Sequence, residues 1–161
     1  MLSRRLQAIA ERVSQGCVLV DVGTDHGRLP VSMLLSGRIV RAIAVDKRTK
    51  PLSSAQRLAE QSGLGPPKFE ARLSDGLDKI SFGEADCLVI AGMGGWTIHS
   101  ILAAAPDKSR SFSQLLLQPN GMAASLRREL WSTGWGITAE DLLWENDQPC
   151  LIIEARYGQG I

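Results

Sequence analysis

The stretch VLVDVGTDHGRLP, residues 18–30, decides the fold, because it reads as a buried strand that runs into a glycine-rich turn and then into a helix. The aliphatic run from Val18 to Val22 is typical of a parallel strand that is covered on both faces. Gly23 and Gly27 allow the backbone of the turn to approach a ligand closely. In open α/β sheets, ligands bind outside the carboxyl ends of the strands, so this turn is the first candidate site.

The side chains of this turn argue against a phosphate ligand. Phosphate-binding turns offer backbone amides and a lysine, whereas residues 21–27, DVGTDHG, contain two aspartates and no lysine. Carboxylates suit a cationic or hydroxyl-rich ligand. S-adenosylmethionine fits this description, because it has an ammonium, a sulfonium and a ribose diol but no phosphate. The alternative is an ordinary strand-to-helix turn in which Asp25 only caps the helix.

The length and composition indicate one globular domain. A chain of 161 residues can form a single core, and its 44% hydrophobic and 22% charged residues argue against a disordered chain. No apolar run approaches the roughly 18 residues of a membrane-spanning helix, and residues 1–13 lack a signal-peptide core, so we expect a cytoplasmic protein. The formal net charge of +1 gives no overall attraction to nucleic acid, which leaves such binding to a local patch.

The cysteines indicate neither disulfides nor a metal site. Cys17, Cys87 and Cys150 lie far apart among apolar neighbours, which favours reduced and buried thiols. No cluster of His, Cys, Asp and Glu has the spacing of metal ligands, so we expect no metal.

Hydrophobic patterning predicts the other elements of the fold. Apolar residues at helical spacing predict a helix over residues 2–13. The further predicted parallel strands are residues 39–45, 68–73, 86–91 and 115–117, and the further predicted helices are residues 29–35, a helix beginning near Pro51, and residues 96–105 and 121–133. Residues 137–146 and 150–157, joined by a turn at 147–149, predict an antiparallel hairpin at the sheet edge. The expected fold is α/β, a Rossmann-like seven-stranded, mostly parallel sheet with helices on both faces and a C-terminal antiparallel hairpin.

Acidic or glycine-rich residues follow each of the first four predicted strands. Asp46 ends the second strand, at the place where an acid in nucleoside-binding α/β domains hydrogen-bonds a ribose; a simple capping role is the alternative. Asp75 follows the third strand, and the glycines of residues 92–95, GMGG, leave room for a flat ligand after the fourth. Together with Asp21 and its turn, these positions reproduce the cofactor face of a Rossmann-like S-adenosylmethionine-dependent methyltransferase.

The combination of DVGTDHGRLP, IAGMGG and QPN, with LSRRLQAIA at the start and SDGL around Asp75, resembles the bacterial TrmK-type tRNA adenine N1-methyltransferases. The resemblance implies that the cofactor is S-adenosyl-L-methionine and that the substrate is tRNA, methylated at adenine N1 at a position of the adenine 22 type. The cofactor contacts that it implies are Asp21, Gly23, Thr24, Asp25, Asp46, Lys47, Asp75, Gly76, Ala91, Gly92, Met93 and Gly94.

The chain departs from the family pattern in two places. Relatives usually have Gly-Glu where this chain has Asp46 and Lys47, and they continue into a helical C-terminal extension. We therefore expect residues 1–161 to form a single methyltransferase domain that lacks this extension. The alternative function is an S-adenosylmethionine-binding module that is inactive on tRNA alone or needs a partner chain.

The expected reaction needs no general base, because adenine N1 offers a lone pair without losing a proton, so the enzyme must chiefly hold the base in line with the methyl group. The residues expected to orient the adenine, and hence assigned as catalytic, are Asp25, His26, Gln118 and Asn120. For His26, a capping or packing role is the alternative.

A local basic patch is the candidate surface for tRNA. Its members are Arg4, Arg5, Arg28, Lys47, Arg48, Lys50 and Arg57. Arg28 and Arg48 are expected to contact phosphates, although a solvated basic face is the alternative. Trp96 is expected to stack on a flipped base, with a place in the core as its alternative.

Overall fold

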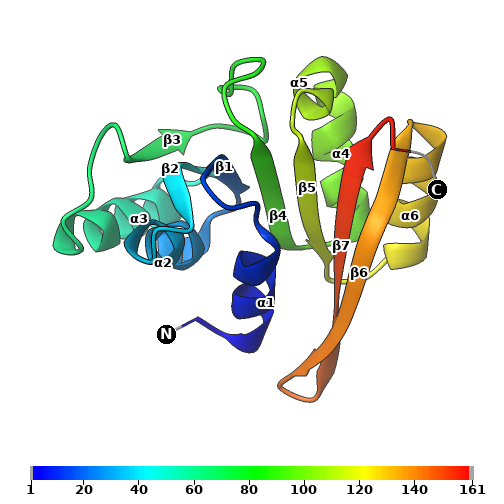
Figure 1. The fold of residues 1–161 in the computed structure, drawn as a ribbon, viewed down its shortest axis with the longest axis horizontal. Coiled ribbons are helices and arrows are strands. Elements are labelled where there is room, and N and C mark those ends of the chain that lie inside the picture. The colour runs from blue at the N-terminus through cyan, green and yellow to red at the C-terminus, as the bar shows by residue number, and fades with distance from the viewer. Residues whose placement is uncertain (1, 160–161) are drawn as a thin grey trace.

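A seven-stranded sheet forms the centre of the computed structural model, which describes residues 2–159 (Figure 1). The strands are β1 Cys17–Val22, β2 Ile39–Asp46, β3 Phe69–Leu73, β4 Cys87–Met93, β5 Gln114–Pro119, β6 Trp135–Glu145 and β7 Gln148–Tyr157. Their order is β3-β2-β1-β4-β5-β7-β6, in which the first five are parallel and β7 pairs antiparallel with both neighbours. The predicted Rossmann-like sheet with its edge hairpin is confirmed.

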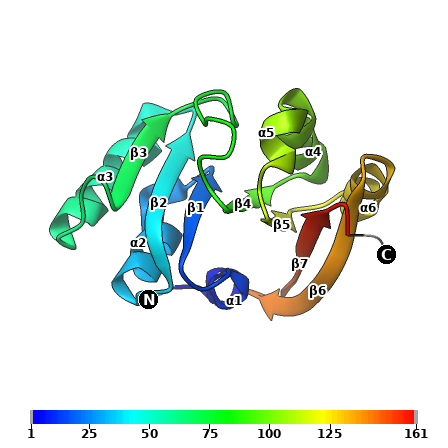
Figure 2. The ribbon, with the colours of Figure 1, turned by 45° about the horizontal axis from the view of Figure 1, so that its top comes forward.

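Helices cover both faces of the sheet, as predicted (Figure 2). One face carries α1 Arg4–Arg12, α2 Arg28–Leu35 and α3 Thr49–Gln61; the other carries α4 Gly95–Ala104, α5 Pro106–Arg110 and α6 Ala123–Ser132. The short α5, which begins at Pro106 one residue after the end of α4, was not predicted from the sequence. No helix among residues 2–159 has the length and apolar character needed to cross a membrane.

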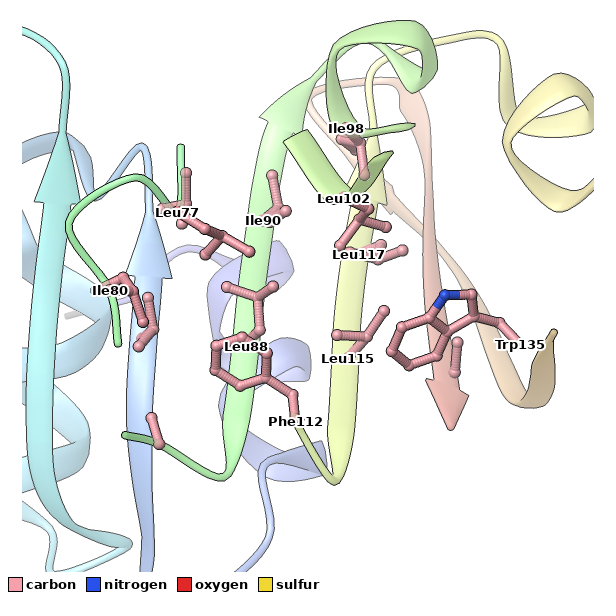
Figure 3. Packing of buried hydrophobic residues seen from close by; sticks show 14 of the residues in the cluster. Leu77, Ile80, Leu88, Ile90, Ile98, Leu102, Phe112, Leu115, Leu117 and Trp135 are labelled. Atoms are coloured by element: carbon pink, nitrogen blue, oxygen red, sulfur yellow. The ribbon is translucent and has the colours of Figure 1, made fainter. Parts of the chain in front are cut away.

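Two hydrophobic cores hold these layers together. On one face, Ile9 of α1 and Met33 of α2 are buried against the sheet. Figure 3 shows the other core, where β4 and β5 face α4 and the loop that precedes β4. Its labelled residues are Leu77, Ile80, Leu88, Ile90, Ile98, Leu102, Phe112, Leu115, Leu117 and Trp135. Burial of such side chains is worth about 1.5–3 kcal/mol each, so this packing holds the helices against the sheet.

Two predicted turns were wrong in position. The glycine turn at residues 92–95 is shorter than predicted, because β4 continues to Met93, which pairs with Pro119 after an irregularity in the ladder. The hairpin turn is Asn146–Asp147 rather than residues 147–149, because both of these residues adopt positive φ values, of 52° and 60°. Asn and Asp tolerate this conformation, which a two-residue hairpin turn requires.

The cysteines are free thiols, as predicted. Cys17 and Cys87 are buried on neighbouring strands, whereas Cys150 is only half-buried. The expectation of burial was therefore wrong for Cys150, which lies near the hairpin tip and lines the cavity described below.

Candidate active site

A cavity of about 770 Å³ lies at the carboxyl ends of the parallel strands. This volume is typical of small-molecule sites, which range over roughly 300–1,000 Å³. The residues that line it at the ends of β1, β2 and β4 and after β1, β2 and β3 include Asp21, Gly23, Thr24, Asp25, Asp46, Lys47, Arg48, Asp75, Gly76, Ala91, Gly92 and Met93. Almost all of the positions predicted to contact a cofactor thus line one cavity; Gly94 does not.

Asp21 is a buried acid of the cavity, with 5% of its surface exposed. Burial raises its pKa from 3.8 to about 7, and the nearby carboxylates of Asp25 and Asp46 act in the same direction. A carboxylate in this position is costly without a cation. The site therefore favours a positively charged ligand group beside Asp21.

Two buried polar atoms in the cavity lack a hydrogen-bond partner within residues 2–159: Thr24 Oγ1 and Asp46 Oδ2. The other oxygen of Asp46, Oδ1, accepts hydrogen bonds from the backbone N–H of Arg48 at 2.9 Å and from its Nε at 3.3 Å. Unpaired buried polar atoms cost free energy unless a ligand or water satisfies them. A ligand with hydroxyl groups at the β2 end of the cavity would satisfy Asp46.

Gly23 keeps the floor of the cavity open. Its φ of +73° favours glycine, and a Cβ at this position would collide with Cε of Met93. Gly92 also has a positive φ, of +77°, and a Cβ there would stand 3.3 Å from Arg5 Nη1. The backbone of both strand ends is thus exposed to a ligand, as the glycine pattern predicted.

The second half of the cavity comes from α1, the loop after β5 and the hairpin tip. Asn120 after β5 was predicted here, whereas the sequence did not place the other residues in the site: Arg5 and Leu6 of α1, and Glu145, Asn146, Gln148 and Cys150 around the hairpin tip. Figure 1 shows α1 beside the lower end of the hairpin. Because β6 runs parallel to β5, the end of β6 and the turn that follows reach the carboxyl edge of the sheet. The hairpin predicted from the sequence already implied that this turn would lie near the cavity.

Arg5 joins α1 to the hairpin. Its backbone N–H donates to Glu145 Oε1 at 3.0 Å, and its Nε lies 3.5 Å from Glu145 Oε2. The backbone hydrogen bond is the main cause that lowers the pKa of Glu145 below its usual value. The guanidinium of Arg5 donates through Nη1 to Gln118 Oε1 at 2.9 Å. Arg5, predicted as part of the basic patch, therefore lies inside the cavity wall.

The predicted catalytic residues occupy different places. Asp25 and Asn120 line the cavity, and Gln118 is buried behind it. His26 does not line the cavity; its Nδ1 lies 2.7 Å from Ser54 Oγ on α3, and its Nε2 lies 3.2 Å from Asp25 Oδ1. His26 thus links the turn to α3.

The predicted substrate residues lie at or outside the cavity mouth. Arg48 lines the cavity through its contact with Asp46, whereas Arg28 is exposed outside it. Trp96 is 53% exposed at the start of α4, so its alternative place in the core is wrong. Within residues 2–159, no group of three or more His, Cys, Asp and Glu side chains is arranged to hold a metal ion, and the absence of a metal requirement stays a prediction.

Known proteins share this arrangement. A family model described as a methyltransferase domain matches residues 2–153. The tRNA (adenine(22)-N(1))-methyltransferase of Bacillus subtilis is 41% identical over 157 residues, which are 96% of this chain and 65% of the relative. The chain therefore spans slightly less than two thirds of the length of this curated relative.

Two solved structures are similar along almost the full chain. A Streptococcus pneumoniae protein in complex with S-adenosyl-L-methionine has a TM-score of 0.95 and 38% identity, covering 99% of this chain and 74% of its own. The m1A22 tRNA methyltransferase TrmK of Bacillus subtilis has a TM-score of 0.93 and 38% identity, covering 98% of this chain and 67% of its own.

Proposed function

Because this chain belongs to the TrmK-type family of methyltransferases, we propose that it transfers a methyl group from S-adenosyl-L-methionine to N1 of an adenine in tRNA. The observation that carries the proposal is the acid-rich cavity at the ends of β1 and β2. There the buried Asp21 makes no ion pair among residues 2–159, and one oxygen of the buried Asp46 has no hydrogen-bond partner among them. The Bacillus subtilis relative is named for methylation at adenine 22, which gives the expected class of position.

The cavity residues fit this cofactor. Asp21 and Asp25 would hold the cationic methionine end, Asp46 Oδ2 the ribose hydroxyls, and Gly76 with Ile101 the flat adenine. Gly23 and Gly92 would leave room along the floor because neither carries a side chain. No lysine lies in the turn after β1, which agrees with a ligand that has no phosphate.

The chain has to align the reactants rather than move a proton. When bound, S-adenosylmethionine supplies a methyl group on a sulfonium, so a new N–C bond forms with the adenine lone pair while the C–S bond breaks and sulfur keeps its electrons. The positive charge thereby passes to the adenine ring. The carboxylates of Asp21 and Asp25 stabilise positive charge on both sides of this transfer, and the wall formed by Arg5 and Glu145 limits where the base can lie.

We expect Asp46→Ala to weaken cofactor binding by about tenfold or more, because a charge-assisted hydrogen bond is worth roughly 1.5–3 kcal/mol. Titration calorimetry with S-adenosylmethionine measures the change. Asp107→Ala is the control, since Asp107 is an exposed aspartate on α5 that does not line the cavity. Equal affinity in the Asp46 variant and the control would remove Asp46 from the ribose site.

We expect tRNA to contact the basic residues beside the cavity mouth. Arg28 and Lys50 are exposed at the beginnings of α2 and α3, whereas Arg48 is tied to Asp46 and is unsuitable for this test. Charge reversal of Arg28 and Lys50 together should weaken tRNA binding and leave cofactor affinity unchanged. The difference in tRNA affinity between the two proteins should shrink as salt rises. Each lost phosphate contact lowers the slope of log affinity against log salt concentration by about one unit or less. Filter binding at two salt concentrations measures the affinity for tRNA. Identical binding curves for the native protein and the variant would show that Arg28 and Lys50 are solvated and do not contact tRNA.

The proposed activity itself is tested by incubating the protein with bulk bacterial tRNA and S-adenosylmethionine labelled on the methyl group. Incorporation of label into tRNA supports an enzyme. Binding of the cofactor without incorporation would instead favour the alternative, a cofactor-binding module that is inactive on tRNA alone or needs a partner chain.

A further inference from the structure

Gln118 has a side-chain amide whose orientation is fixed by its neighbours. Its Oε1 accepts hydrogen bonds from the backbone N–H of Gly92 and from Arg5 Nη1, both at 2.9 Å. These two groups are donors only, so the oxygen must face them. The Nε2 of Gln118 accordingly points the other way, where it donates to the backbone oxygen of Pro119 and to Asn120 Oδ1, both at 3.2 Å.

This chain of hydrogen bonds also determines what Asn120 presents to the cavity. Because Asn120 Oδ1 accepts from Gln118, the Nδ2 of Asn120 is the end left with free N–H groups, and it has no hydrogen-bond partner among residues 2–159. The backbone N–H of Asn120 donates to the oxygen of Met93 at 2.7 Å, which holds the residue beside the end of β4. Asn120 therefore offers a fixed donor, with a second lone pair on Oδ1 as an adjacent acceptor.

We propose that Asn120 recognises the target base by its Hoogsteen edge, with Nδ2 donating to N7 of adenine and Oδ1 accepting from the N6 amino group. This inference rests on the proposed function, because it assigns the base that the cavity takes beside the cofactor. Asparagine pairs with adenine in this way in other nucleic-acid complexes. The contact leaves N1, on the Watson–Crick edge, uncovered, so that N1 can face the methyl group.

The fixed amide also explains a preference for adenine over guanine. Guanine has acceptors at both N7 and O6, so it would need two donors from the protein. In its fixed orientation Asn120 would place Nδ2 against N7 but Oδ1 against O6, so that two acceptors would face each other. Rotating the amide would only exchange the two atoms, and it would bring Nδ2 against the donor Nε2 of Gln118. Arg5 and Gln118 thus act on the base through Asn120, and they are positioning residues rather than catalytic ones.

The test combines one variant with one altered substrate. The substrate is a tRNA in which the adenosine that the native protein methylates is replaced with 7-deazaadenosine, which lacks the N7 acceptor but keeps N1. The variant is Asn120→Asp, which still accepts from Gln118 but places an oxygen against N7. We expect the altered substrate to lower kcat/KM of the native protein by about tenfold, and Asn120→Asp to lower it by a similar factor on unmodified tRNA.

The decisive comparison is the variant with the altered substrate. Because the donor is already lost in Asn120→Asp, removing N7 should lower its kcat/KM no further, within about twofold. Calorimetry should show that the variant binds S-adenosylmethionine at least as tightly as the native protein, because the new carboxylate lines a cavity for a cationic ligand, and such binding shows that the variant is folded. Methylation of the 7-deaza substrate by the native protein at the unmodified rate would overturn the inference while leaving the proposed function standing; no methylation of unmodified tRNA would instead overturn the proposed function.

A second variant tests the positioning role of Gln118. Gln118→Glu keeps an acceptor for Arg5 and Gly92 but presents an acceptor to Asn120, so the amide of Asn120 should rotate and turn its oxygen toward the base. We expect kcat/KM on unmodified tRNA to fall about tenfold while the difference between unmodified and 7-deaza substrates disappears. A variant that still distinguishes the two substrates tenfold would show that Gln118 does not set the orientation of Asn120.

Discussion

Replacing Asp21 with asparagine should weaken S-adenosylmethionine binding by about tenfold or more and, at the same time, stabilise the ligand-free protein at pH 8. The first effect follows from the loss of a carboxylate that faces the cationic end of the cofactor. The second follows from burial, which raises the pKa of Asp21 to about 7. A buried carboxylate without a cation lowers the free energy of unfolding, and asparagine removes that charge.

The raised pKa of Asp21 makes the stability of the ligand-free protein depend on pH. In the unfolded chain Asp21 ionises near its ordinary pKa of 3.8, whereas in the ligand-free fold it stays protonated up to about pH 7. Its contribution to stability is therefore complete below pH 4 and is lost as the pH rises to 7, an effect on the order of 4 kcal/mol. The native protein and Asp21→Asn should be equally stable below pH 4, and the variant should become increasingly the more stable one as the pH rises to 8.

Cofactor binding should show the opposite trend. Because the cation binds the ionised form of Asp21, the affinity of the native protein for S-adenosylmethionine should rise between pH 6 and pH 7.5, and that of Asp21→Asn should stay flat. Denaturant unfolding and titration calorimetry at these pH values measure both effects. A variant with native affinity, or with a native pH dependence of binding, would place the cationic end of the cofactor elsewhere.

Replacing Gly95 with alanine should destabilise the protein by about 1–3 kcal/mol and abolish most of its activity, because the added methyl group would overpack a backbone contact. A Cβ at Gly95 would stand 2.5 Å from the backbone oxygen of Met122 and 3.0 Å from that of Gly121. These atoms belong to the loop between β5 and α6, which begins at Asn120. The methyl group would therefore push α4 away from the residue that we expect to hold the base.

The neighbouring glycine provides a matched control. Gly94 has extended backbone angles, φ −64° and ψ 152°, and a Cβ there would have no atom within 4 Å. Gly94→Ala should keep native stability and activity. Thermal unfolding and the tRNA methylation assay compare the two variants, and equal behaviour of both would show that the contact between α4 and the loop does not organise the site.

The part of the site formed by the ends of the parallel strands could be predicted from the sequence, because short local motifs mark it. Asp21, Asp46 and Asp75 each lie at or just after the carboxyl end of a strand, and the carboxyl ends of parallel strands meet at one edge, so their shared cavity could be foreseen. The other half depends on contacts between segments distant in the sequence. Glu145 meets Arg5 across almost the full length of the chain, and no periodicity or short motif links them.

The turn positions were harder to predict than the strands themselves. Met93 reads as part of a glycine-rich turn, but its backbone pairs with β5 because the ladder contains an irregularity after Ala91. Gln148 and Pro149 suggest a turn by composition, yet Asn146 and Asp147 take the positive φ values that close the hairpin. In both cases pairing with a neighbouring strand overrode local preference.

The most direct measurement of the proposed function is mass spectrometry of the nucleosides from bacterial tRNA after incubation with the protein and S-adenosylmethionine. We predict that 1-methyladenosine accumulates, that no N6-methyladenosine forms, and that Asp21→Asn and Asp46→Ala each lower the yield at limiting cofactor. If the native protein binds S-adenosylmethionine but produces no 1-methyladenosine, or methylates a different atom, the proposed function is contradicted.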